Sequence, residues 1–240
     1  MSKFIAEQAF WDIFPDAQIG VVLATDIDNS AAGTSHAQTD IQNFLDTGHR
    51  EAQKFLGAGV FSENPVIAVW RLAYQKFRTK KGARCSIENL LKRVEKGSAV
   101  GAINPLVDIY NAVSLHYGLP CGGEDIDAFC GDLRLTVTNG GDDFLALGDD
   151  ANDNTLPGEV CYLDDAGAVC RCWNWRDGQR TMLTEETKNA FLIIESVDPA
   201  RSCDLKDALE TLAARTTQYL GGKSQIFLID KANPEIKLPG

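Results

Sequence analysis

The sequence has few residues of the kinds that bind metal ions or build disulfide frameworks. Its three histidines, at positions 36, 49 and 116, do not show metal-ligand spacing. Its seven cysteines are an odd number without a C-x-x-C pair, which favours reduced thiols. We therefore expect no metal site and no cofactor. Most thiols are expected to fill the core, namely Cys85, Cys121, Cys130, Cys161 and Cys203.

Signals for membranes, export and common catalytic chemistry are also missing from the sequence. No apolar run is long enough and free enough of charge to span a bilayer, and the N-terminus lacks a basic region followed by an apolar one. No G-x-S-x-G elbow, P-loop or G-x-G-x-x-G turn occurs. We expect a cytoplasmic protein that binds no membrane and carries no standard nucleophile motif.

Positive charge is scarce. The 23 lysines and arginines stand against 34 aspartates and glutamates, which gives a net charge of -11. This balance disfavours a broad basic track, so any nucleic acid would have to be held locally. The one concentrated basic segment runs from Arg78 to Arg84. A solvated helix end that complements the helix dipole is its first explanation, and a contact with phosphate is its second.

The apolar residues, 44% of the chain, are sufficient for a substantial core. Their spacing predicts helices first, then hairpins, then a strand, a helix and a strand, which indicates an α+β (mixed α/β) fold in one domain, residues 1–240. The expected helices are 36–56, 66–82, 87–97 (capped by Ser86), 105–117 and 202–220. The expected strands are 18–26, 190–197 and 224–230, with hairpins over 133–147 and 160–175 and a loosely held tail at 232–240.

The stretch from Ser98 to Asp127 contains the first candidate pocket wall. Asn104 and Pro105 are suited to open a helix, and Gly118 is suited to close it. The turn expected at 121–125 has a bare glycine backbone that a ligand can approach closely. With the carboxylates of Asp125 and Asp127, these features predict a pocket, although an ordinary helix and loop explains the same residues.

The second candidate lies in the arm from Arg171 to Arg176. Trp173 and Trp175, with an arginine on each side, offer flat apolar surface and forked donors, which suit a planar ligand that carries a carboxylate or a phosphate. Simple strand alternation explains the same pattern, with one tryptophan in the core and one arginine at the rim.

Several ordered motifs together resemble a known family. They are NPLVDIYNAVSLHYGLPCGGEDID, LRLT, GDDFLALGDD, GEVCYLDDAGAVCRCWNWR and TEETKNAFLIIES. This series is similar to the B3/B4 domain of the bacterial phenylalanyl-tRNA synthetase β subunit, and more closely to free-standing relatives of that domain, best over residues 98–198. The resemblance implies a three-layer domain with a mixed, mostly antiparallel sheet system and helices outside. It also implies a pocket for an aminoacyl ester or aminoacyl-tRNA, because this domain hydrolyses mischarged tyrosine from tRNA in the synthetase.

The match to the family has gaps at the site itself. Val107, Asp108 and Asn111 match its helix motif, Pro120, Asp125 and Asp127 match the following turn, and residues 184–189 match the segment before the buried strand. Gly122 stands where the editing domain has a histidine, Glu124 replaces a phenylalanine, and Tyr110 replaces a threonine. The Trp173–Arg176 arm replaces a glycine-rich region. The fold is therefore expected to transfer better than the activity.

Two functional hypotheses follow. The first is a stand-alone editing deacylase in which Asn111, Asp125 and Asn174 orient ester, amine and water. The second is a non-catalytic module that binds tRNA, an aminoacyl-tRNA acceptor end or a small amino-acid-like ligand. Both require the segments 104–127 and 171–187 to face each other across one hollow. The expected binding residues are Asn104, Tyr110, Ser114, Gly122, Gly123, Arg171, Trp173, Trp175, Arg176, Thr184 and Glu186.

Overall fold

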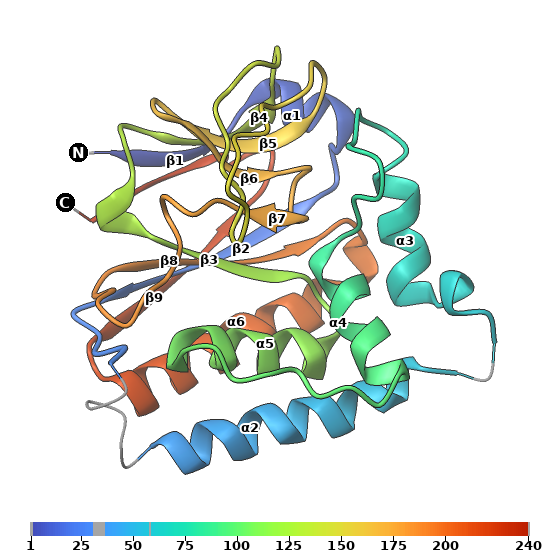
Figure 1. Cartoon of the computed structure of the whole chain (residues 1–240), viewed down its shortest axis with the longest axis vertical. Coiled ribbons are helices and arrows are strands. Elements are labelled where there is room, and N and C mark those ends of the chain that lie inside the picture. The colour runs from blue at the N-terminus through green and yellow to red at the C-terminus, as the bar shows by residue number, and fades with distance from the viewer. Residues whose placement is uncertain (1, 31–36, 58, 240) are drawn as a thin grey trace.

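A computed structural model describes residues 2–30, 37–57 and 59–239. Two sheets and six helices make up the described chain (Figure 1). The strands are β1 (Lys3–Ala6), β2 (Gln18–Thr25), β3 (Cys121–Asp125), β4 (Leu133–Val137), β5 (Val160–Asp164), β6 (Gly167–Arg171), β7 (Arg176–Asp177), β8 (Ala190–Ser196), β9 (Lys223–Ile229) and β10 (Glu235–Lys237). The helices are α1 (Gln8–Ile13), α2 (Gln38–Glu51), α3 (Pro65–Ala73), α4 (Ser86–Glu95), α5 (Pro105–Tyr117) and α6 (Ser202–Leu220).

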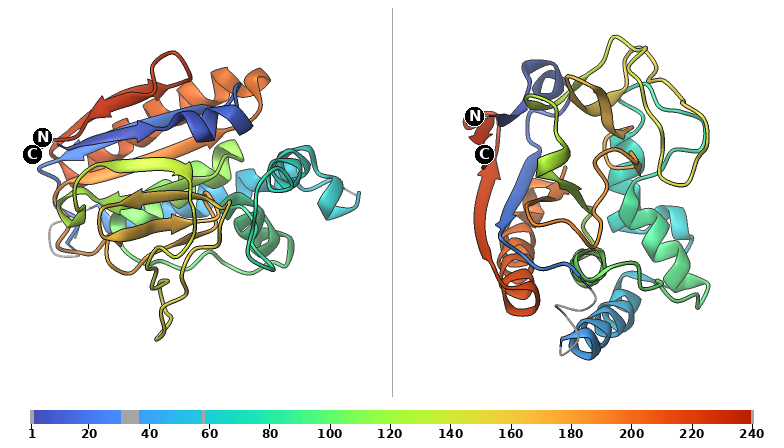
Figure 2. Two further views of the ribbon diagram at one scale, coloured as in Figure 1. Left: turned by 90° about the horizontal axis from the view of Figure 1, so that it is seen from above. Right: turned by 60° about the vertical axis from the view of Figure 1, so that its left-hand side comes forward.

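The strands form one sheet of six, in the order β10-β1-β4-β5-β6-β7, and one of four, in the order β3-β8-β2-β9. Every pair of named strands is antiparallel except β1 and β4. The two sheets lie face to face, and α5 and α6 cover the outer face of the four-stranded sheet, with α2 against α5 (Figures 1 and 2). The predicted mixed fold with mostly antiparallel strands and helices outside is confirmed.

The apolar run of β8 is buried on both faces, as the sequence predicts. Alternate side chains enter different cores because successive residues of a strand point to opposite faces. Phe191 and Ile193 pack between the two sheets, whereas Leu192 and Ile194 pack under the helices. The space between the sheets is therefore walled by every second residue of β8.

Asparagine and glycine residues set the ends of α5 and its close packing against α2. Val107 N donates to Asn104 Oδ1 at 3.1 Å, and Gly118 ends α5 in a left-handed conformation, so the predicted cap and terminator are confirmed. α2 crosses α5 at Gly48, where a Cβ atom would lie 2.7 Å from the carbonyl oxygen of Ala112. The predicted helix over 36–56 includes α2, although His36 lies outside the described residues.

Several local predictions are wrong. Residues 144–147 do not pair with 133–138, because the loop over 138–159 returns the chain so that β4 pairs with β5. Residues 121–125 form the edge strand β3, since their backbone pairs with β8. Residue 85, not Ser86, is the N-cap of α4, and α3 ends at Ala73.

The C-terminal end of the described chain is also more ordered than predicted. β10 pairs with β1, which the sequence did not predict, so the tail over 232–239 is held in the six-stranded sheet.

Among the cysteines expected in the core, Cys130 and Cys203 are exposed and the other three are buried. The hairpin of β5 and β6, the strand β9 and the helix α6 are confirmed.

Candidate functional site

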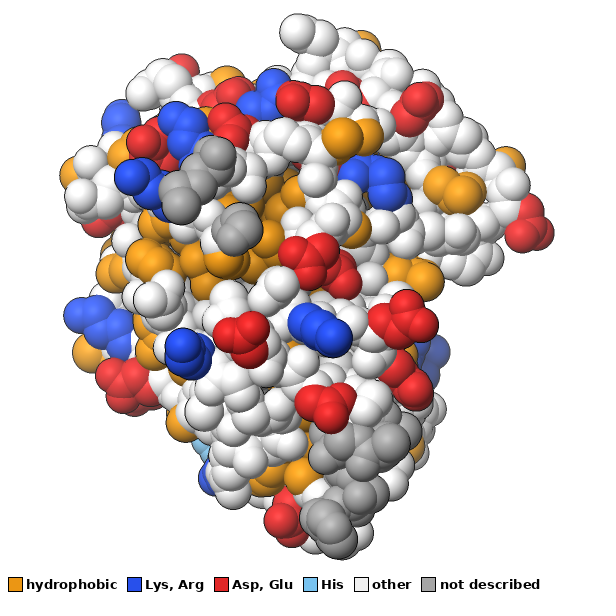
Figure 3. All heavy atoms as spheres, turned by 90° about the vertical axis from the view of Figure 1, so that its left-hand side faces the viewer, with side chains coloured by type: hydrophobic (Ala, Val, Ile, Leu, Met, Phe, Trp, Pro, Cys, Tyr) orange, Lys and Arg blue, Asp and Glu red, His pale blue; other side chains and the backbone are white. Residues whose placement is uncertain are grey.

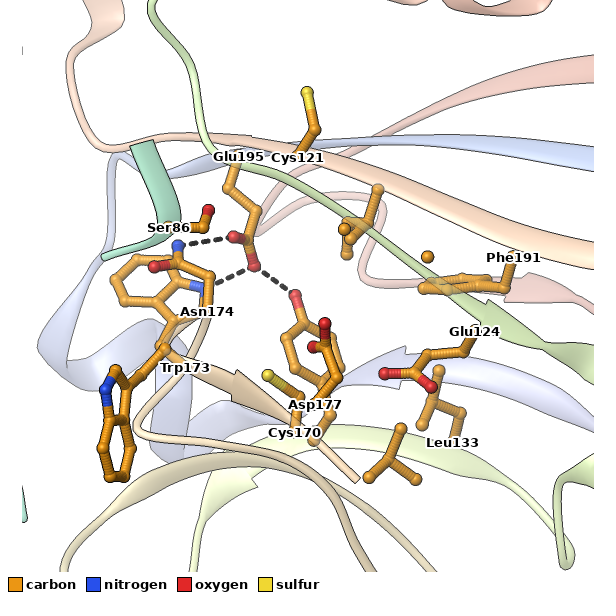
Figure 4. Close-up of a pocket in the computed structure, with 16 residues that line it drawn as sticks. Ser86, Cys121, Glu124, Leu133, Cys170, Trp173, Asn174, Asp177, Phe191 and Glu195 are labelled. Carbon is orange, nitrogen blue, oxygen red and sulfur yellow. Dashed lines mark hydrogen bonds between the residues drawn. The ribbon is translucent and has the colours of Figure 1, made fainter. Parts of the chain in front are cut away.

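A cavity of about 60 Å³ lies between the two sheets. One wall comes from β3 and β8, the other from β4, β5, β6 and the arm that follows β6 (Figure 4). Strand register explains the first wall, because Gly122 pairs with Ile193 and Glu124 with Phe191, and these four residues face the same side. The lining residues are Ser86, Cys121, Gly122, Gly123, Glu124, Leu133, Tyr162, Val169, Cys170, Trp173, Asn174, Trp175, Asp177, Phe191, Ile193 and Glu195.

Glu195 supplies a buried carboxylate that binds both sheets together. Its Oε1 accepts from Trp173 Nε1 at 2.5 Å and from the hydroxyl of Tyr162, and its Oε2 accepts from Asn174 Nδ2 at 2.6 Å (Figure 4). Burial raises the pKa of Glu195 to about 7, although these three donors act in the opposite direction. A carboxyl group of this pKa exists in both protonation states near neutral pH.

Glu124 and Asp177, from β3 and β7, bring two further carboxyl groups to the cavity, and Asp177 lies between Glu195 and Glu124 in the view of Figure 4. The side chain of Glu124 is 6% exposed, and its buried Oε2 has no hydrogen-bond partner among the described residues. Burial, reinforced by the negative charge of Asp177, raises the pKa of Glu124 well above its ordinary value. Burial raises the pKa of Asp177 as well. This part of the cavity is acidic and incompletely satisfied.

Trp173 fixes the shape of the cavity on the arm side. It has a φ of 66°, in the left-handed region that a bulky side chain rarely adopts. Its fully buried ring lies 5.1 Å from the ring of Phe10, 4.6 Å from Phe14 and 5.0 Å from Trp70. This packing holds the tight turn 172–175, and with it Asn174, whose Oδ1 accepts from Tyr74 Oη at 2.9 Å.

The cavity offers no activated nucleophile among its lining residues. Burial raises the pKa of the Cys170 thiol, and of the Cys121 thiol, well above the ordinary value, so both stay protonated at neutral pH. No group of three or more histidine, cysteine or acidic side chains in the described part of the chain is placed to hold a metal ion. The lining residues themselves offer hydrogen bonding and proton transfer to or from a carboxyl group.

The structure brings together five of the residues expected from the sequence: Gly122, Gly123, Trp173, Asn174 and Trp175 line the cavity. Trp173 is the buried tryptophan, and Trp175 is half-buried. The expected hollow between 104–127 and 171–187 therefore exists where β3 meets the arm. The helix α5 does not take part in it, because α5 lies on the far side of the four-stranded sheet.

The other expected residues occupy structural positions outside this lining. Arg171 is fully buried and forms a two-point ion pair with Glu159 at 3.0 and 2.6 Å. Arg176 pairs with Asp149 at 2.8 Å on the surface. Four of the remaining residues belong to α5 or its N-cap: Asn104 caps the helix, Ser114 Oγ donates to Leu119 O, Asn111 is buried, and Tyr110 packs near Gly123. Asp125 ends β3 and accepts from Thr187, whereas Thr184, whose Oγ1 accepts from Glu186 N, and the exposed Glu186 lie in the loop before β8.

Sequence reasoning missed the acidic residues of the cavity. Glu195 carries the one charge within AFLIIES, and a charge inside a strand buried on both faces is a signal for a functional or paired group. Glu124 is a second signal for a functional group, because it places a carboxylate at a position where the family has phenylalanine. No local pattern marked Asp177, which follows a tight turn in a strand of two residues.

Comparison with known proteins assigns the family. The model of the B3/4 domain matches residues 69–220. The chain belongs to the B3/4 domain family. Over 103 residues it is 30% identical to the phenylalanine–tRNA ligase beta subunit of Xanthomonas axonopodis pv. citri, a match that covers 43% of this chain and 13% of that protein. The chain thus spans a small part of the length of this relative.

A solved structure is similar to this chain in its fold. It is an N-terminal fragment of the phenylalanyl-tRNA synthetase beta subunit from Pyrococcus horikoshii, with a TM-score of 0.50 and 13% identity. The match covers 99% of this chain and 54% of the fragment. At this identity the likeness concerns the fold. In the described residues, no helix is long and apolar enough to cross a membrane.

Proposed function

We propose that the cavity between the sheets hydrolyses the ester bond of mischarged aminoacyl-tRNA. The observation that carries this proposal is Glu195, a buried carboxyl group with a pKa of about 7 in a cavity without an activated nucleophile. A general base is most effective when its pKa lies near the working pH. The relation of this chain to the phenylalanine–tRNA ligase beta subunit supports a substrate related to tRNA.

In this mechanism Glu195 activates water directly. A carboxylate has about four acceptor positions, and two donors occupy Oε1 while one occupies Oε2, so Oε2 keeps a position for a water proton. The water loses that proton to Glu195 as its oxygen attacks the ester carbonyl. Glu195 then returns the proton to the departing ribose oxygen. Asn174, held by Tyr74, fixes the carboxylate in place during both steps.

A neighbouring groove suits the acceptor end of the nucleic acid. It lies between α3 and α4, has a volume of about 290 Å³, and is lined by Arg71 and Arg84 with Glu88 between them. Arg84 is two residues from Ser86, which lines the cavity, and Ser86 N donates to Asn174 O at 3.1 Å. A phosphate held by this groove would lie close to an ester held in the cavity.

The surface charge fits a local grip of this kind. On the face shown in Figure 3, which lies opposite the side of α3 and α4, acidic and basic side chains surround an apolar area without a continuous basic track. With a net charge of -11, long-range attraction to RNA is weak, so specificity must come from the groove and the cavity.

A second function, binding without catalysis, is favoured by one specific observation. Gly122 stands in the cavity wall where the resembling editing domains have a histidine, so this chain lacks that side chain. A module of this kind would bind aminoacyl-tRNA, or a small amino-acid-like ligand, and leave the ester intact.

The test is the deacylation of a panel of mischarged tRNAs by the intact protein. We expect hydrolysis of at least one substrate at more than ten times the rate in buffer, and a loss of at least tenfold in Glu195→Gln. Glu210→Gln, on the exposed face of α6, is the matched control and should retain the full rate. Binding of tRNA without faster hydrolysis of any substrate would refute the enzyme and support the binding module.

A further inference from the structure

The acidic part of the cavity lacks a cation. Glu124 and Asp177 form no ion pair with a lysine or arginine in the described ranges. Arg180, the cation that acts on Glu124 from nearby, is bound to Asp164 through two contacts of 2.8 and 2.7 Å. The buried carboxyl group of Glu124 and the half-buried one of Asp177, on facing sheets, therefore have no ion-pair partner, which disfavours their charged forms until a cation binds.

The hydrogen-bonding capacity in this part of the cavity is also unfilled. Glu124 Oε2 and the Thr181 hydroxyl are both buried, the hydroxyl opposes the rise in the pKa of Glu124, and neither atom has another hydrogen-bond partner among the described residues. A primary ammonium group has three donors and no acceptor. It can donate to the two carboxyl groups and to a third oxygen at once, and its positive charge favours the ionised form of both carboxyl groups.

The size of the cavity limits what can accompany the ammonium group. Its volume is about 60 Å³, whereas a cavity that binds benzene has about 150 Å³. Trp173 is fully buried in its aromatic surroundings and cannot easily yield space. On the opposite wall Gly122 leaves room, because a Cβ atom there would meet only Ile193 Cγ2, at 3.6 Å. A small aliphatic side chain fits this space, and a phenol ring does not.

We propose that Glu124 and Asp177 bind the α-ammonium group of a small amino acid, so that the site accepts alanine- or serine-sized aminoacyl groups and rejects tyrosine. This inference rests on the proposed function, because it names the substrate class of the same cavity. It gives Glu124 and Asp177 the role of binding the amine, while Glu195 acts on water.

The test uses amides that resist hydrolysis, measured by calorimetry with the intact protein at neutral pH. L-alaninamide and L-serinamide are the ammonium probes, N-acetyl-L-alaninamide is the neutral control, and L-tyrosinamide tests size. We expect the two small ammonium probes to bind at least tenfold more tightly than either of the others. Equal binding of the acetylated probe would overturn the ammonium site, and equal binding of tyrosinamide would overturn the size limit. Failure of both small probes to bind overturns the proposal as a whole.

Two variants test the residues. Glu124→Gln and Asp177→Asn should each weaken the binding of L-alaninamide at least tenfold, whereas Glu210→Gln should leave it unchanged. Thermal unfolding distinguishes a binding role from a structural one, because removing an unpaired buried carboxyl group should keep or raise the melting temperature. If one variant fails to fold, the other carries the test. Unchanged affinity in a folded variant would contradict the assignment.

The two proposals fail in different ways. Binding of L-alaninamide that depends on Glu124, with no deacylation of any tRNA, would leave the ammonium site standing and remove the hydrolase. Deacylation of tyrosyl-tRNA alone, with no binding of the small probes, would leave the hydrolase standing and remove the ammonium site.

Discussion

Trp173 Nε1 donates to Glu195 Oε1 at 2.5 Å, and this contact joins the two sheets across the cavity. The indole sits in a left-handed backbone conformation within a cluster of four other aromatic rings. Strained backbone geometry persists only where the surroundings enforce it. The position of Glu195 is therefore set from the opposite sheet.

Replacing Trp173 should expose this dependence. Trp173→Phe keeps an aromatic ring but removes the indole donor, so we expect a loss of about 2–3 kcal/mol in the free energy of unfolding, since a hydrogen bond to a charged group is removed. Urea unfolding measures this. Trp175→Phe, at a half-buried ring, is the matched control and should cost less than about 1 kcal/mol. Similar losses in both variants would contradict the special role of Trp173.

The two glycines of β3 allow a matched pair of substitutions, because they face opposite sides of one strand. Gly123→Ala should destabilise the protein by about 1–3 kcal/mol, since its Cβ would lie 2.8 Å from Leu192 Cδ2 and 2.9 Å from Leu183 Cδ1. Gly122→Ala should change stability by less than about 1 kcal/mol, because only Ile193 lies nearby, at 3.6 Å.

The loss of activity should be greater in Gly122→Ala than in Gly123→Ala, which is the opposite of the order expected for stability. Gly122→Ala reduces the cavity and should lower deacylation or the affinity for L-alaninamide at least tenfold while thermal unfolding stays near that of the wild type. If Gly122→Ala kept full activity, the cavity would not be the site.

Two arginines of the arm should differ in their effect on stability. Arg171→Ala leaves Glu159 buried and unpaired, and we expect a loss of about 3–5 kcal/mol. Arg176→Ala removes a surface pair with Asp149 and should cost less than about 1 kcal/mol. Chemical denaturation of both variants measures the difference, and equal effects would show that the burial of Arg171 is not what matters.

The pKa of Glu195 predicts a pH dependence of stability. Because burial raises its folded-state pKa to about 7, from an ordinary value near 4.5, the folded state binds a proton between these values that the unfolded state has lost. Stability therefore falls as pH rises from about 4.5 to 7, by up to about 3 kcal/mol from this group at about 1.4 kcal/mol for each pKa unit.

Glu195→Gln removes this titration and serves as the comparison. Glu124 and Asp177 remain in both proteins, and the charge of Asp177, which helps to raise the pKa of Glu195, forms part of the effect that the comparison measures. We expect wild type and variant to differ by a constant below about pH 4.5 and the wild type to lose stability relative to the variant up to about pH 7. Denaturant midpoints measured across this range would refute the assignment if the two curves ran parallel.

Much of the fold could be predicted because its signals are local. The buried strand β8, the helix α6 and the cap of α5 at Asn104 each follow from a run of neighbouring residues. The pairing of β4 could not be predicted in this way, because Asn139 and Gly140 make a good turn while the true partner strand begins at Val160. Contacts between residues that are far apart in the sequence, on the two sides of the loop over 138–159, decide that pairing.

The site could be predicted even less well than the fold, because it is assembled from residues that are far apart in the sequence. The tryptophan arm and the glycines of β3 were found because their composition is unusual, but α5 was placed with them only because it is adjacent in sequence. The four-stranded sheet separates Asn111 from the cavity. Glu195 and Asp177 meet the site through sheet register and a tight turn, neither of which a single stretch of sequence reveals.

The pairing of β1 with β10 brings the first and last strands of the domain side by side in one sheet. The polypeptide therefore enters and leaves at nearly the same point (Figure 1). Such a unit can be inserted into a loop of a larger protein without disturbing the cavity between its sheets. Its two termini can also be joined and the chain opened elsewhere. A circularly permuted version, opened between the exposed residues Asp150 and Ala151 of the polar loop, should keep whatever chemistry the cavity performs.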